Sequence, residues 1–74
     1  MFRKLKLKKQ IRRCLREIRL LEQRRSRSQA ALVSAILTGT TPADDDVDYF
    51  NRYTAEINAT RERLHQLKRE YEAL

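Results

Sequence analysis

The only Gly and the only Pro of this 74-residue chain lie close together, at Gly39 and Pro42. Gly39 suits the left-handed residue that commonly ends a helix. Thr41, Pro42 and Asp44 are typical of a helix start. The Thr hydroxyl would accept a hydrogen bond from a free backbone N–H, and Pro would occupy the first helical position. Asp44, three residues after Thr41, would complete a variant of the capping box. The chain therefore has one predicted point of reversal, with a helix on either side.

Rows of residues with heptad spacing flank this turn. The first helix, expected at about 3–38, carries the row Leu7, Ile11, Cys14, Ile18, Leu21, Arg25, Ser28, Leu32 and Ala35. The second helix, expected at about 42–73, carries Phe50, Tyr53, Ile57, Thr60, Leu64, Leu67, Tyr71 and Leu74. Two such rows on either side of a short turn, 39–41, predict an all-α fold: one antiparallel coiled-coil hairpin spanning residues 1–74 as a single domain.

Folding the two helices about this turn predicts which residues meet. Leu21 is expected near Leu64, and Cys14 near Tyr71. Because the first helix is the longer one, residues before about Ile11 are expected to project beyond the end of the second helix, with nothing from their own chain to pack on.

Arg25 and Ser28 interrupt the apolar row of the first helix. A buried, unpaired Arg costs several kcal/mol, so Arg25 must either pair with a carboxylate or extend its head group to water. Polar layers of this kind set the register of many coiled coils. The alternative is that Arg25 contacts a ligand.

The segment from Ala30 to Leu37 is apolar on nearly every face of a helix, and one partner helix cannot cover it. A chain this short also buries a small core, which self-association commonly supplements. We therefore predict a homodimer that forms a four-helix bundle at the turn end. The expected interface residues are Ala30, Ala31, Val33, Ser34 and Leu37. The alternative is that this patch docks a different protein.

Positive charge is concentrated at the start of the chain. Residues 1–27, which we call the basic arm, hold 12 Lys or Arg and two acids, whereas residues 28–74 hold five Lys or Arg and eight acids. Seven cations of the arm lie away from the heptad row: Lys6, Lys9, Arg12, Arg13, Arg16, Arg19 and Arg27. With so few acids among them, these cations are expected to bind a polyanion rather than form a merely solvated or protein-pairing face.

Among polyanions, nucleic acid is favoured over a membrane, because the apolar row of the first helix is already used against the second. The contacts are expected to be to phosphates, since no Asn and only one aromatic residue, Phe2, lie in the basic arm. The sequence thus predicts a small regulator or accessory protein that binds nucleic acid. A protein-interaction module, an adaptor or inhibitor docking through residues 30–37, is the alternative.

Catalytic, metal and cofactor sites are not expected. One Cys and one His cannot build a zinc site, and one Gly leaves no phosphate-binding loop. His65 has no nucleophile or carboxylate arranged around it, and the acids at 44–48 fit a helix start better than a cation loop. The lone Cys14 suits a reducing cytoplasm, and residues 1–9 lack the apolar core of a secretory signal. An organellar transit peptide is the alternative for this basic segment.

Overall fold

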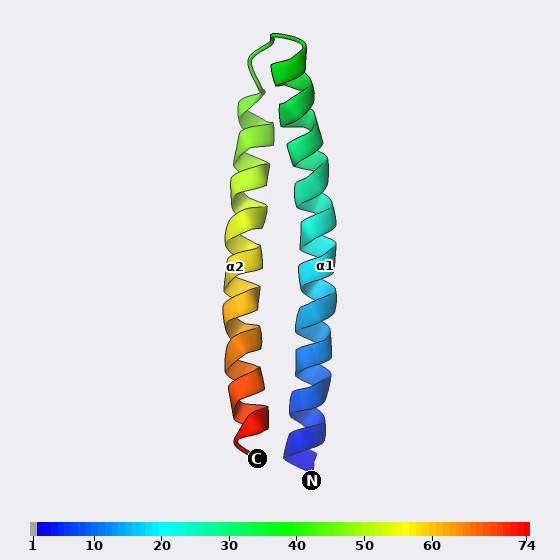
Figure 1. Cartoon of the computed structure of the whole chain (residues 1–74), viewed down its shortest axis with the longest axis vertical. Coiled ribbons are helices and arrows are strands. Elements are labelled where there is room, and N and C mark those ends of the chain that lie inside the picture. The colour runs from blue at the N-terminus through cyan, green and yellow to red at the C-terminus, as the bar shows by residue number, and fades with distance from the viewer. Residues whose placement is uncertain (1) are drawn as a thin grey trace.

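The structure is a computed structural model that describes residues 2–74. It consists of two helices, α1 (Phe2–Leu37) and α2 (Asp44–Glu72), which run antiparallel and pack along their length. The two chain ends lie at the same end of a rod that measures 57 × 15 × 14 Å (Figure 1). The predicted all-helical hairpin is confirmed.

Gly39 ends α1 as predicted, with a left-handed φ of 72°. The backbone N–H of Thr40 donates to the carbonyl of Ala35, and that of Gly39 donates to the carbonyl of Ile36. This pair of bonds is the Schellman arrangement, which satisfies carbonyls that the end of a helix leaves free. The hydroxyl of Thr40 also donates to the Ala35 carbonyl, so the turn is closed by side chain and backbone together.

The start of α2 differs from the prediction. The helix begins at Asp44, its N-cap is Ala43 with extended backbone (φ −64°, ψ 140°), and no side chain caps it. The expected cap at Thr41 is therefore wrong, and the turn covers 38–43 rather than 39–41. The physical reason lies in the first turn of α2, where three consecutive Asp residues offset the positive end of the helix dipole without a side-chain cap.

The predicted heptad rows face each other and form the core. Among residues 2–74, the buried side chains are Leu7, Cys14, Ile18, Leu21, Ile57, Thr60 and Leu64. Ile57 is fully buried, and the hydroxyl of Thr60 donates to the Glu56 carbonyl one turn back, so this polar group is satisfied. Toward the turn the row is only half-buried, and at the other end Leu74 is exposed.

The register of the two helices is shifted from the one expected. Cys14 lies in one buried cluster with Ile18 and Leu64, and Leu64 is seven residues, about two helical turns, from the expected neighbour, Tyr71. The turn accounts for the shift, because α1 extends further toward the bend than the start of α2 does (Figure 1).

In this register some of the first residues of α1 have partners on α2. Leu7 is 5% exposed, and the Lys4 ammonium lies 5.1 Å from the centre of the Tyr71 ring, a cation–π contact. The expectation that residues before Ile11 have nothing to pack on is therefore wrong for Leu7 and Lys4. Phe2, in contrast, is 89% exposed.

Arg25 is half-buried in the row and forms no salt bridge within residues 2–74. No buried side-chain nitrogen or oxygen in this part of the chain lacks a hydrogen-bond partner. The Arg25 stem therefore lies along the row while its guanidinium extends to water, one of the two outcomes that the sequence allowed.

We expect the core to depend on Ile57. Replacing Ile57→Val removes one methylene from a fully buried site and should lower the free energy of unfolding by about 1 kcal/mol. Ile36→Val, at a side chain that is 67% exposed, is the matched control and should change it little. Urea unfolding followed by circular dichroism measures both; equal losses would contradict the assignment of the core.

The turn provides a second test. Gly39→Ala forces a side chain into the left-handed region, and it should cost about 1–2 kcal/mol although no atom lies within 4 Å of the added Cβ. Gly39→Asn should cost less, since Asn tolerates this conformation. Thermal unfolding at one fixed protein concentration compares the variants, and a neutral Gly39→Ala would show that the turn does not hold this conformation.

Candidate polyanion interface

The cations of the basic arm lie on the outer surface of α1. The helix turns by 3.6 residues, so positions three or four apart that avoid the buried row share the outward face. All seven residues singled out from the sequence are exposed: Lys6, Lys9, Arg12, Arg13, Arg16, Arg19 and Arg27.

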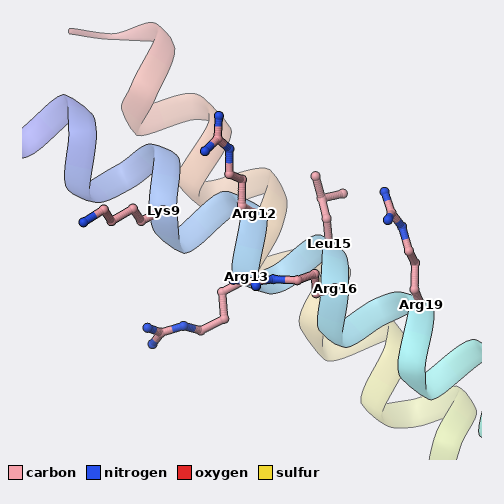
Figure 2. Close-up of a pocket in the computed structure, with 6 residues that line it drawn as sticks. All are labelled: Lys9, Arg12, Arg13, Leu15, Arg16 and Arg19. Carbon is pink, nitrogen blue, oxygen red and sulfur yellow. The ribbon is translucent and has the colours of Figure 1, made fainter.

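Five of these cations surround one shallow depression on α1. Its lining residues are Lys9, Arg12, Arg13, Leu15, Arg16 and Arg19 (Figure 2). Arg12, Leu15 and Arg19 project to one side of the helix in this view, and Lys9 and Arg13 project to another. Lys6 and Arg27 do not line this depression. Leu15 was not expected from sequence; its spacing of three and four from Arg12 and Arg19 is the only signal that places it there.

The two carboxylates of the basic arm are both occupied by α2. Arg61 donates to Glu22 and Arg63 donates to Glu17, each with a nitrogen–oxygen distance of 2.9 Å. These pairs lie at the surface, with side chains roughly half exposed. Arginines of the second helix therefore pair with the two acids that the basic arm itself contains.

The cations of the arm consequently remain without carboxylate partners. Within residues 2–74, none of the 12 Lys or Arg side chains of the arm takes part in a salt bridge. Their one aromatic partner is Tyr71, which Lys4 contacts. A surface of this kind attracts external anions, because its charge is not offset within the same molecule.

Arg63 of α2 lies beside Cys14 of the buried row and pairs with Glu17 at the surface. The neighbouring Cys14 side chain, and after it the Glu17 carboxylate, raise the pKa of Arg63 above its ordinary value. Arg63 therefore stays charged at every pH at which the protein is handled. Cys14 itself is buried, consistent with its place in the row.

The apolar segment near the turn forms a second surface feature. A shallow groove on α1 is lined by Ser26, Gln29, Ala30, Val33, Ser34, Leu37 and Thr38. Four of the five expected interface residues line it, whereas Ala31 is half-buried and does not. Ile36 and Leu37 are 67% and 81% exposed, so the hairpin leaves large apolar side chains uncovered at this end.

Other chemistry has little support in the part of the chain that the structure describes. No three His, Cys, Asp or Glu side chains of residues 2–74 are grouped so that they could hold a metal ion. Within the same range, neither helix has a stretch long and apolar enough to cross a membrane. His65 is exposed on α2.

Comparisons with known proteins add no identity. No protein-family model, curated protein or solved structure matches this chain.

The two ion pairs should contribute little to folding, because both are solvent-exposed. We expect the double variant Glu17→Gln, Glu22→Gln to lower the free energy of unfolding by less than about 2 kcal/mol in total. Urea unfolding measures this change, with Glu56→Gln, Glu62→Gln as a control of equal charge. A larger loss in the first variant alone would show that the pairs hold the helices together.

Proposed function

We propose that this chain is a non-enzymatic regulator or accessory protein that binds nucleic acid, or a nucleic-acid-bound complex, through the phosphate backbone. The observation that carries the proposal is the set of cations on the basic arm that no carboxylate within residues 2–74 pairs with. The free thiol of Cys14 suits the cytoplasm as the place of action.

The spacing of the cations suits a row of phosphates. From Lys6 to Arg19 these cations follow one another at three or four residues, about one helical turn or roughly 5.4 Å along α1, except that Arg12 and Arg13 are neighbours; Arg27 lies eight residues beyond Arg19. From Lys6 to Arg27 the row extends over about 30 Å of straight helix. A row of this length neutralises several phosphates and releases their counterions, which favours binding most strongly at low salt.

Recognition is of backbone rather than bases. Phe2 is the only aromatic residue of the first helix, so α1 offers no series of rings on which unpaired bases could stack. Tyr49 and Tyr53 stack on each other in α2, with ring centres 6.3 Å apart. Asn, a common reader of base edges, occurs only at positions 51 and 58 in α2. A paired nucleic acid, bound without sequence preference, fits these features best.

Dimerisation at the turn end belongs to this proposal. The exposed apolar groove supports an interface through Ala30, Ala31, Val33, Ser34 and Leu37, with a four-helix bundle as the result. In this assembly the half-buried part of the row near the turn gains cover that one hairpin alone does not provide.

The exposure of Ile36 and Leu37 also favours a second candidate function. In this alternative the chain is an adaptor or inhibitor that docks on a larger protein through residues 30–37, and the basic arm meets an acidic surface. Purification of complexes with and without nuclease separates the two functions. Complexes that survive nuclease support docking on protein, and complexes that dissolve support nucleic acid.

Binding to a short duplex, followed by fluorescence anisotropy at several salt concentrations, tests the main proposal. The affinity should fall steeply as salt rises. Replacing Arg12, Arg16 and Arg19 by Gln should weaken binding by about tenfold or more and reduce the slope of log K against log salt by up to about 3. An affinity that does not change with salt would exclude phosphate neutralisation.

The matched control removes the same charge from the other helix. Arg52, Lys68 and Arg69 lie in α2, outside the basic arm, and form no salt bridge within residues 2–74. Replacing these three by Gln should leave most of the affinity. Equal losses in both triple variants would show that net charge, rather than the basic arm, governs binding.

A further inference from the structure

The hairpin has two unlike sides, and its two ion pairs mark them. The Glu22–Arg61 pair lies on one side and the Glu17–Arg63 pair on the other, because each pair joins the two helices across one flank of the buried row. Residues three or four apart share a helix face, so each side can be followed from its ion pair toward the turn.

The side marked by Glu22 and Arg61 carries no charge toward the turn. On α1 it continues through Ser26, Ala30, Val33 and Leu37, all of which line the groove. On α2 it continues through Asn58, Thr54, Phe50 and Val47. We call this surface the uncharged side.

The opposite side carries charge on α1 as far as Arg27 and on α2 at Arg52 and Glu56. There α1 presents Arg24 and Arg27, which share a shallow depression with Tyr49 of α2. Arg52 and Glu56 of α2 follow at helical spacing from Arg63. Although 36% of the residues of the chain are charged, one side of the hairpin thus has a face of two helices that carries no charge.

A second copy of the chain is the occupant that suits the uncharged side. Four-helix bundles bury such two-helix faces against each other, and Ser26 and Ala30 are small enough to let a neighbouring helix approach closely. Both copies then cover the same apolar side chains, including Val33 and Leu37, with no charge left unpaired in the contact.

The cations on α1 determine whether the two copies pack parallel or antiparallel. Toward the open end, the same face of α1 continues as Arg19, Leu15, Arg12 and Lys8. In a parallel dimer these cations would face their equivalents along the whole rod. In an antiparallel dimer only the uncharged sides overlap, and the acidic start of α2, Asp44–Asp46, lies toward the partner's Arg19.

We propose that a second copy covers the uncharged side in the antiparallel direction, so that the dimer carries one basic arm at each end and bridges two nucleic-acid duplexes. This inference rests on the proposed function. The overlap from Ser26 to Leu37 covers about 18 Å, so two rods of 57 Å form an assembly about 95 Å long. Arg19 and the partner's Arg19 then lie about 37 Å apart along the rod, several Debye lengths, so the parts of the two arms from Arg19 outward do not repel each other.

Small-angle X-ray scattering combined with light scattering tests the arrangement without nucleic acid. The expected result is a dimer with a maximum dimension of about 95 Å. A dimer no longer than one hairpin, 57 Å, would overlap along the whole rod, in either direction, and would overturn the inference. A monomer at micromolar concentrations would overturn it as well.

Energy transfer between two short duplexes, one carrying a donor dye and the other an acceptor, tests bridging. The wild-type protein should bring the dyes together. Ala30→Glu places a charge on the uncharged side and should abolish the transfer while leaving the affinity for one duplex unchanged. Ala59→Glu, at another exposed Ala but on the opposite side, is the matched control and should keep the transfer. Circular dichroism confirms that both variants retain their helicity.

The outcomes separate this inference from the proposed function. Binding of single duplexes without energy transfer overturns bridging and leaves the proposed function intact. Absence of duplex binding overturns both bridging and the proposed function, while the scattering still decides whether the dimer overlaps only at the turn end or along the whole rod. Loss of transfer in both Ala variants would show that added negative charge, rather than the uncharged side, is responsible, and would count against the interface.

Discussion

The apolar contact between the two helices is the interaction on which the remaining structure depends. Within residues 2–74 the buried side chains form a single row centred on Cys14, Ile18, Ile57 and Leu64. The chain has one Cys and therefore no internal disulfide that could supplement this contact. The row keeps α1 straight and directs its outer face to solvent, so the cations of the basic arm are held in line by packing on the opposite face of the same helix.

Electrostatics follows from the same contact. By bringing α2 alongside α1, the row places Arg61 and Arg63 next to the only two acids of the basic arm. Although the second helix is acidic overall, its arginines pair with the acids of the first helix, so these acids no longer balance the cations of the first helix. Net charge alone does not reveal this effect; it depends on which residues face each other. The resulting molecule is a rod whose positive potential is concentrated along one helix and whose acids gather near the turn and on α2.

The sequence was sufficient for the architecture because one Gly, one Pro and two heptad rows leave few other folds. It was insufficient for the register. Heptad rows repeat every seven residues, so Cys14 meets an apolar partner in more than one register, and only the conformation of the turn selects Leu64 over Tyr71. The extended backbone at Ala43, which sets where α2 begins, has no signature in the residue types.

The same limit applies to the candidate site. Outward cations such as Arg12 and Arg16 can be identified from spacing alone, since their place on α1 does not depend on α2. The ion pairs of Glu17 and Glu22, and the contrast between the two sides of the hairpin, depend on the register and could not be derived without it. Leu15 lies outside the heptad row, and the structure leaves it at the surface beside Arg12 and Arg19.

The uneven burial of the row has a consequence for how the molecule moves. Its buried residues lie between Leu7 and Leu21 on α1 and between Ile57 and Leu64 on α2, while the half nearer the turn is only half-buried. Local opening costs the least free energy where the fewest apolar contacts must be broken. In an isolated hairpin the bend therefore frays and exchanges its amide protons before the buried middle of the rod, around residues 14–21 and 57–64, does.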